Sequence, residues 1–164
     1  MSKKKQSQNP YIDMDTIRQA DQRLVMKKIE QQGHCPFCPE NLHLYHQKPI
    51  LKDGQYWLLT DNQWPYNKVK HQLLAIYKTH IEHLKDVAPD AGKELFRFFG
   101  EIIEEREILG GGLAIRFGSN DKLGNYGSSV KHLHAHLIEP DLEALDQTEA
   151  WRLKFGQPKN YRKK

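Results

Sequence analysis

The sequence predicts a single α+β domain with a mainly antiparallel sheet. Its 164 residues are enough for one sizeable core, and no repeat or long linker divides them. The Asp-Gly pair at residues 53–54 indicates a hairpin between two short apolar segments. Further on, one strongly periodic helix separates a buried strand from two more strands. Hairpins and helices in this order favour the α+β class.

The N-terminal part of the chain predicts a tail and then a helix. Residues 1–10 are polar, and we expect them to be disordered. Residues 11–33 form a helical extension, in which the helix runs from about Met14 to Gln32 and Gly33 ends it. The apolar positions near helical spacing are Ile17, Leu24, Val25 and Ile29. A Cys-Pro-Phe-Cys turn follows, and Pro39-Glu40-Asn41 is predicted to be a loop.

The later elements follow from hydrophobic spacing and from Gly, Pro and Asp residues. In order they are hairpin strands at 49–51 and 56–59, a loop at 61–67, a strand at 72–77, a helix at 90–109, strands at 113–117 and 130–138 around a glycine-rich loop at 118–127, and a weak helix at about 142–153 before a basic tail. Glycines 110–112 end the long helix.

Composition excludes several classes of protein. No apolar run approaches the roughly 18 residues that a membrane span needs, and residues 1–6 have no apolar stretch behind their lysines, so they are not a secretory signal. We therefore expect a cytoplasmic protein with no membrane partner. The formal charge is +4, but seven basic residues lie in the two tails, which leaves 18 basic against 21 acidic residues in the rest. Specific nucleic-acid binding is not expected.

Three histidines at alternate positions, His132, His134 and His136, are the most informative feature of the chain. Alternation along a strand places all three imidazoles on one face. Such a row suits metal binding, or acid/base and nucleophilic chemistry near neutral pH. A solvated strand face with no chemical role is the alternative.

The two cysteines, Cys35 and Cys38, are two residues apart. In a reducing compartment this spacing is typical of a metal knuckle or a redox pair. Because two thiolates cannot complete a tetrahedral zinc site, the metal interpretation needs two more donors. Two free thiols in a turn are the alternative.

Four motifs in order resemble the histidine triad (HIT) family. They are Cys35-Pro36-Phe37-Cys38, the segment from Gln72 to Ile81 with Lys78-Thr79-His80-Ile81 at its end, Gly127-Ser128-Ser129-Val130, and His132-Leu133-His134-Ala135-His136-Leu137-Ile138. The resemblance covers about Cys35 to Pro140 and implies a HIT domain at 34–140, with a C-terminal helix and basic tail at 141–164. It further implies a HIT-like fold of five mainly antiparallel strands with two main helices, besides the N-terminal helix, and a homodimer.

The resemblance also implies a nucleotide site and a role for each residue in it. His134 would attack the α-phosphate, and His136 would hydrogen-bond the phosphate or the leaving oxygen. Neutral imidazole suits the attack, because its intermediate can be opened by water. The expected nucleotide or phosphate ligands are Ser129, Gly127, Asn120 and Asp61, with Asn62 as the alternative to Asp61 and with Trp64 and Tyr66 as candidates for stacking on a base. A main-chain carbonyl in the 118–127 loop is expected to hold the second nitrogen of His134.

In zinc-containing relatives the remaining metal donors correspond to His80 and to the first triad histidine. The resemblance therefore implies one structural zinc per chain, held by Cys35, Cys38, His80 and His132, a donor set that structural zinc favours. His83 is the alternative to His80, and His34 lies outside the pattern.

The function that these residues imply is nucleotide hydrolysis with release of a nucleoside monophosphate. Related nucleotidyl transferases tend to carry Gln at the third triad position, so His136 favours hydrolysis. Two alternatives stay open: a phosphorylase or transferase that uses the same intermediate, and a non-catalytic nucleotide-binding module.

Overall fold

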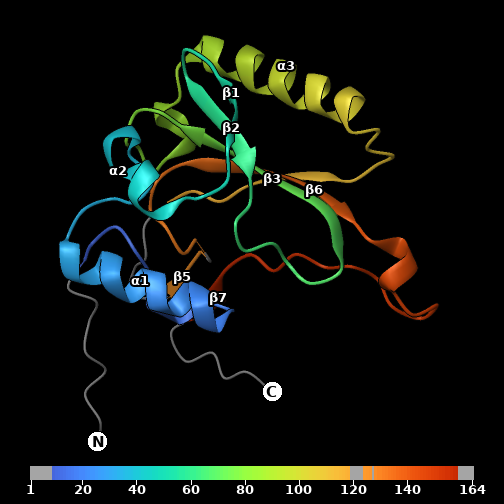
Figure 1. Cartoon of the computed structure of the whole chain (residues 1–164), viewed down its shortest axis with the longest axis horizontal. Coiled ribbons are helices and arrows are strands. Elements are labelled where there is room, and N and C mark those ends of the chain that lie inside the picture. Colours follow the sequence, from blue (N-terminus) through green and yellow to red (C-terminus); the bar gives the residue numbers. More distant parts are fainter. Residues whose placement is uncertain (1–8, 119–123, 127, 159–164) are drawn as a thin grey trace, which may run out of the picture.

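The computed structural model describes residues 9–118, 124–126 and 128–158, and a five-stranded antiparallel sheet lies at its centre (Figure 1). In spatial order the strands are β1 (Ile50–Asp53), β2 (Trp57–Asp61), β3 (Val69–Tyr77), β6 (His134–Pro140) and β4 (Gly112–Ile115). A separate two-stranded sheet pairs β5 (Gly124–Asn125) with β7 (Gln157–Pro158). The α+β class and the five-stranded sheet are confirmed.

Helix α3 (Pro89–Glu105) covers one face of the sheet and encloses the main core (Figure 1). The core residues of the helix are Leu95, Phe98, Phe99 and Ile102, and they pack against Trp57, Leu59, Leu73, Ala75, Leu133, Ala135 and Leu137 of the sheet side. The helix ends four residues before the predicted Leu109. The chain turns back after Arg106, with a positive φ at Glu107, so that Ile108 joins the core.

The opposite face of the sheet carries two of the triad histidines, His134 and His136, whereas His132 precedes the strand. Ala135 and Leu137 of β6 point toward α3, so His134 and His136, which alternate with them, lie on the other face. Strand β6 begins only at His134, four residues after the predicted start, because Val130 makes an isolated bridge to Ile12 instead of extending the sheet.

Helix α2 (Pro39–Tyr45) packs on this second face, where the sequence had predicted a loop. That prediction is wrong because Pro39 occupies the first turn, where a helix tolerates it. Leu42 then reaches a small core formed with Leu58, Leu74 and Ile76. Burial of one leucine therefore stabilises a helix of only seven residues.

The predicted N-terminal helix is present as α1 (Ala20–Gln32), preceded by a 3-10 turn at Met14–Thr16. Gly33 ends it with φ 72° and donates its N–H to the carbonyl of Ile29. A second apolar cluster joins this extension to the chain that leads into β6, and its buried members are Ile12, Ile17, Met26, Ile29, Cys35 and Val130. Figure 1 shows α1 and α3 on opposite sides of the sheet.

The prediction of a helix at about 142–153 is wrong. Only a 3-10 turn, Leu142–Ala144, forms, capped by the carboxylate of Asp141. Leu142 is 74% exposed, so no buried apolar face stabilises a longer helix. The chain continues without helix, and the indole N–H of Trp151 donates to the carbonyl of Asn67. Among the described helices, none combines the length and the hydropathy that crossing a bilayer requires.

Candidate functional site

The ring of His134 is held in one orientation by the main chain beside it. Its Nδ1 lies 2.7 Å from the carbonyl oxygen of His132, so Nδ1 carries the proton and donates it to this hydrogen bond. The sequence predicted that a carbonyl of the 118–127 loop would hold this nitrogen. The structure shows that the carbonyl of His132, two residues upstream, holds it instead. In the neutral ring, Nε2 is then left with its lone pair free.

Burial keeps this ring neutral. It lowers the pKa of His134 to about 4, with a smaller contribution from the charge of Arg116, and both outweigh the bond to the carbonyl of His132. Since the side chain is only 7% exposed, protonation would place an additional charge in a largely dry site. His134 therefore has the protonation state of a nitrogen nucleophile at neutral pH.

The neighbouring ring, His136, has the opposite arrangement of protons. Gln72 of β3 places its side-chain nitrogen 3.1 Å from Nδ1 of His136, while its side-chain oxygen accepts the backbone N–H of Tyr66 at 2.6 Å. Because that backbone donor fixes which way the amide points, Nδ1 of His136 must accept. The proton of the neutral ring then lies on Nε2, where it can be donated to a ligand.

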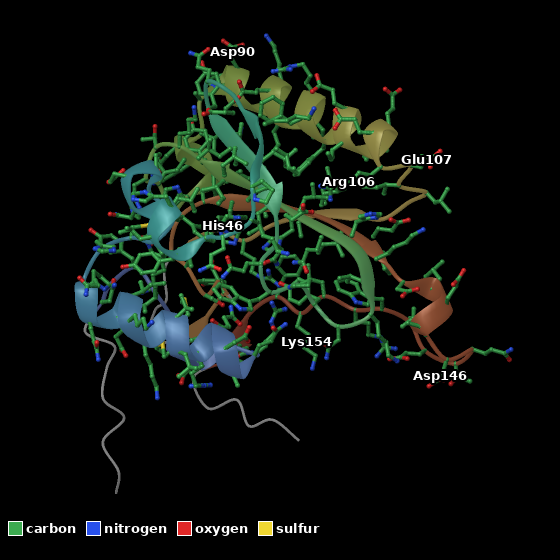
Figure 2. All side chains as sticks on the ribbon, viewed as in Figure 1. His46, Asp90, Arg106, Glu107, Asp146 and Lys154 are labelled. Atoms are coloured by element: carbon green, nitrogen blue, oxygen red, sulfur yellow. The ribbon has the colours of Figure 1, made fainter. Side chains whose placement is uncertain are left out.

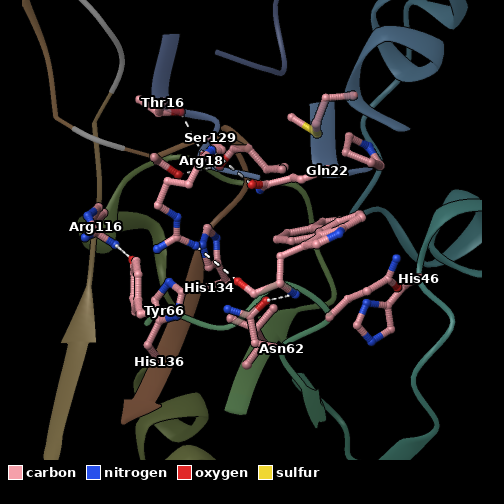
Figure 3. A pocket seen from close by; sticks show the side chains of 18 of the residues that line it. Thr16, Arg18, Gln22, His46, Asn62, Tyr66, Arg116, Ser129, His134 and His136 are labelled. Carbon is pink, nitrogen blue, oxygen red and sulfur yellow. Dashed lines mark hydrogen bonds between the residues drawn. The ribbon is translucent and has the colours of Figure 1, made fainter. Parts of the chain in front are cut away.

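A cavity of about 740 Å³ opens in front of these two rings (Figure 3). Its volume lies in the upper part of the range of small-molecule sites, roughly 300–1,000 Å³. One part is apolar and is lined by Met26, Ile29, Phe37 and Leu42, with Trp64 beside them. Other lining residues are cationic, and they are Arg18, Arg116, Arg152 and Lys154.

Tyr66 links two of these cations to the triad. The guanidinium of Arg18 lies over its ring, 3.8 Å from the centroid, and Arg116 donates to its hydroxyl at 3.0 Å. The ring itself is tilted against His136, with centroids 6.1 Å apart. Figure 3 shows Arg116 at the hydroxyl end of Tyr66 and the side chain of Arg18 beside the same ring. Arg18 thus occupies one face of the Tyr66 ring, one of the two aromatic side chains predicted to stack on a base, the other being Trp64.

Two of the four predicted phosphate or ribose ligands, Ser129 and Asp61, lie in the described part of the chain, and of these only Ser129 lines the cavity. Ser129 lines the cavity, and its Oγ is 2.8 Å from the hydroxyl of Thr16. Asp61 does not line it, because both its oxygens are bound by Arg106, at 2.5 and 2.9 Å, at the end of α3 (Figure 2). The alternative residue, Asn62, does line the cavity. Gly127 and Asn120 lie outside the described residues.

Among the residues of this site that were not predicted from the sequence are Arg18, Gln72 and Arg116. Gln72 was visible as the polar start of an otherwise apolar strand, a signal that a polar group is buried for a reason. Arg116 interrupted the predicted strand 113–117 in the same way. Arg18 had no such signal, because an arginine on an amphipathic N-terminal extension is ordinary.

The four predicted metal ligands lie together next to the triad. Their donor atoms all lie within 4.8 Å of one another, although their residues come from three separate parts of the chain. Sγ of Cys35 is 3.4 Å from Nδ1 of His132, Sγ of Cys38 is 3.6 Å from Nδ1 of His80, and the two Nδ1 atoms are 3.2 Å apart. This cluster, found among the described residues, could hold a metal ion.

The geometry of the cluster fits a tetrahedral metal. Zn–S and Zn–N bonds of about 2.3 and 2.0 Å give edges of about 3.5 Å between sulfur and nitrogen and about 3.3 Å between nitrogens, close to the separations observed. Nε2 of His132 donates to the carbonyl of Tyr77, which turns the lone pair of Nδ1 toward the cluster. Neither alternative histidine takes part: His83 lies beside Gly118, and His34 bonds the hydroxyl of Tyr45.

Comparison with known proteins adds a family and a fold. The HIT domain model matches residues 45–142. A histidine triad protein from Clostridium difficile is 18% identical with a TM-score of 0.52, covering 83% of this chain and 100% of that one. A Zn-bound histidine triad family protein from Mycobacterium smegmatis is 20% identical with a TM-score of 0.50, and the match covers 73% of this chain and 82% of that one. A histidine triad nucleotide-binding protein from Candida albicans is 18% identical with a TM-score of 0.51, and the match covers 74% of this chain and 85% of that one. At these identities the likeness shows the fold. A search of curated proteins finds no match.

Proposed function

The chain belongs to the HIT domain family, and from that premise we propose that it is a nucleotide hydrolase that cleaves at the α-phosphate through a covalent nucleotidyl-histidine intermediate. One observation carries the proposal. The carbonyl of His132 takes the proton of Nδ1, which leaves a neutral His134 with its Nε2 lone pair free beside the cavity. A histidine in this state can attack phosphorus without first losing a proton.

The second triad residue of the cavity, His136, supports the departure of the leaving group. Its Nε2–H, set by Gln72, can donate to the phosphate or to the leaving oxygen as negative charge develops there. Burial, then the ring of His134 and the charges of Arg116 and Arg18, holds the pKa of His136 well below its ordinary value. It therefore acts as a neutral hydrogen-bond donor at pH 7, and water opens the intermediate to release a nucleoside monophosphate.

We also propose roles for the nucleotide ligands that the sequence predicts. We assign the hydroxyl of Ser129 to the phosphate, because it lines the cavity on the chain segment that leads into the triad. Gly127 and Asn120 remain proposed phosphate or ribose ligands. For the ribose we favour Asn62 over Asp61, since the arginine pair occupies both oxygens of the latter. The apolar part of the cavity would hold the base.

We further propose that the ion in the cysteine–histidine cluster is zinc, because two thiolates and two imidazoles in a tetrahedron are a preferred zinc set. None of the four ligands lines the cavity. Bound there, zinc would supply a cross-link between the turn at Cys35–Cys38 and the start of the triad strand. Its role would be to hold the triad strand in place.

The test of the hydrolase is a trapped intermediate. Wild-type protein mixed with adenosine phosphoramidate or diadenosine tetraphosphate and quenched with acid should carry an added nucleotide on His134, located by mass spectrometry. His134→Ala should lose the adduct and at least about 1,000-fold in kcat. His43→Ala, a change at an exposed histidine of α2, is the matched control. Turnover that survives His134→Ala would exclude this nucleophile.

The alternatives separate in the same assay. A phosphorylase would place added inorganic phosphate in the nucleotide product, whereas a hydrolase would place oxygen from labelled water there. A binding module would retain nucleotide affinity and show neither adduct nor turnover. His136 at the third triad position favours the hydrolase.

We further propose a homodimer, and one edge of the sheet supports it. Within the described residues, β4 lies at one of the two edges of the sheet and pairs with β6 alone, and Leu113 in β4 and Leu109 before it are exposed, the latter to 89%. An unpaired edge with apolar side chains favours pairing with a second chain. Light scattering should give twice the chain mass, and Leu109→Glu should lower it; a monomer at micromolar concentration would contradict the dimer.

A further inference from the structure

We propose that the cavity continues beside His136 into a subsite for a phosphate-bearing leaving group, formed by Arg18 and Arg116. This inference rests on the proposed hydrolase and deepens it: the substrate is a nucleotide whose α-phosphate is joined to further phosphates, not one joined to an amine. The two guanidiniums would bind the departing phosphates.

The charge of the cavity wall supports an anionic ligand. Its described lining contains four cationic side chains and one carboxylate, Asp15. Walls of low dielectric around an excess of one charge concentrate the field on a ligand of opposite charge. A neutral amine leaving group would make no use of this field, whereas a chain of phosphates would.

Within the described part of the chain, Arg116 is built into the cavity wall without an anion to balance it. The side chain is 8% exposed, and one nitrogen donates to the hydroxyl of Tyr66 and another to the carbonyl of Lys154. Its Nε–H is buried with no partner, and no carboxylate among the described residues pairs with it. Burying a guanidinium with only neutral acceptors is costly. Binding of phosphate oxygens near it would recover part of that cost.

Arg18 adds the second charge from another part of the chain. It lies over the ring of Tyr66 and donates to the carbonyl of Trp64 at 3.1 Å, which uses one of its five N–H donors. The remaining donors can meet phosphate oxygens in the paired geometry that guanidinium groups favour. Each arginine lowers the pKa of His136, as two cations close to that ring must.

The position beside His136 matches the direction of the reaction. As the Nε2 lone pair of His134 bonds to the α-phosphorus, the bond from that phosphorus to the bridging oxygen breaks. The electron pair stays on this oxygen, which becomes a terminal oxygen of the departing phosphate chain. Water then adds to phosphorus, the N–P bond returns its pair to Nε2, and the protons of the water leave on the products or in solvent. Cations near His136 stabilise the charge on the departing oxygen.

The two arginines also explain why this specificity lies partly outside the family domain. Arg18 precedes the matched residues 45–142, and Arg116 is anchored by Lys154, which follows them. The N-terminal extension and the C-terminal segment therefore close the cavity on its cationic side.

The experiment compares two substrates that share a nucleoside and differ in the leaving group. The kcat/KM of wild type, Arg18→Gln and Arg116→Lys is measured with adenosine 5′-phosphoramidate and with diadenosine tetraphosphate, and with ATP to ask whether a second nucleoside is needed. Each variant should lose about 10- to 100-fold on the polyphosphates, at least tenfold more than on the phosphoramidate. Arg97→Gln, an exposed change on α3, is the control.

A second measurement keeps the subsite testable without turnover. Inorganic tripolyphosphate should bind wild type and Arg97→Gln in calorimetry, and Arg18→Gln should weaken it at least tenfold. Equal losses on both substrates, or tripolyphosphate that binds all variants alike or none, would overturn the subsite. If neither substrate is cleaved but tripolyphosphate binds as expected, the hydrolase proposal fails while the anion subsite stands.

Discussion

The proposed zinc site makes the sharpest prediction about stability, through the change His80→Ala. This change removes one of four donors and leaves the cavity untouched, since His80 does not line it. Nδ1 of His80 lies 3.6 Å from Sγ of Cys38 and 3.2 Å from Nδ1 of His132, so a metal in the cluster would need it. We expect the variant to lose the metal and much of its stability.

The magnitude follows from the loop that the metal closes. Cys35 and His132 are 97 residues apart, and a metal between them restricts the unfolded chain as a cross-link does. The chain-entropy relation for a loop of that length gives about 4 to 5 kcal/mol. For a chain of this size each kcal/mol moves Tm by about 2 to 4 °C. Loss of the metal should therefore lower Tm by about 10 to 20 °C.

The assay is scanning calorimetry together with metal analysis of the purified protein. Wild type should contain close to one zinc per chain, and a strong chelator should lower its Tm as far as His80→Ala does. His83→Ala is the matched control, because His83 lies beside Gly118 and outside the cluster. Metal-free wild type that melts within about 2 °C of the untreated protein would refute the cross-link, as would loss of metal in His83→Ala.

Three further predictions test the rest of the site. Gln72→Leu removes the donor that fixes the proton of His136, and kcat should fall about 10- to 100-fold with a smaller change in KM, measured in steady state. A rise in KM with kcat unchanged would contradict this role. Asp61→Asn should weaken the pair with Arg106 and lower the free energy of unfolding in urea by about 0.5 to 1 kcal/mol, while kcat/KM stays within about threefold. A large loss of kcat/KM would return Asp61 to the nucleotide site. Among the described residues, the charged and titratable groups close to His136 are His134, Tyr66, Arg18 and Arg116. Since the pKa of His136 is lowered on folding, the unfolded chain binds this proton first. The contribution of His136 to stability should therefore fall as pH drops below about 6.5, by up to about 1.4 kcal/mol per pH unit. His136→Asn should reduce the slope of stability against pH in urea titrations by that contribution, and an unchanged slope would contradict it.

The sheet and its long helix were predictable because their signals are local. Alternation in β6 and helical spacing in α3 reflect which side chains must leave water, and this choice is made within a few residues. Helix α2 was missed because a single buried leucine stabilises it. The weak helix after Pro140 was overpredicted, because its leucines find nothing to pack against: Leu142 is 74% exposed.

The sequence by itself determined the class of fold, the family motifs and which side chains gather: the cysteine pair with His80 and His132, and His134 with His136. Only the tertiary structure decided which proton each ring carries, because Gln72 and His136 lie on different strands and meet through the register of β3 with β6. It also decided that Asp61 is paired away from the cavity. The grouping of Arg18 with Arg116 likewise depends on side-chain direction across distant segments, and no local pattern in the sequence encodes it.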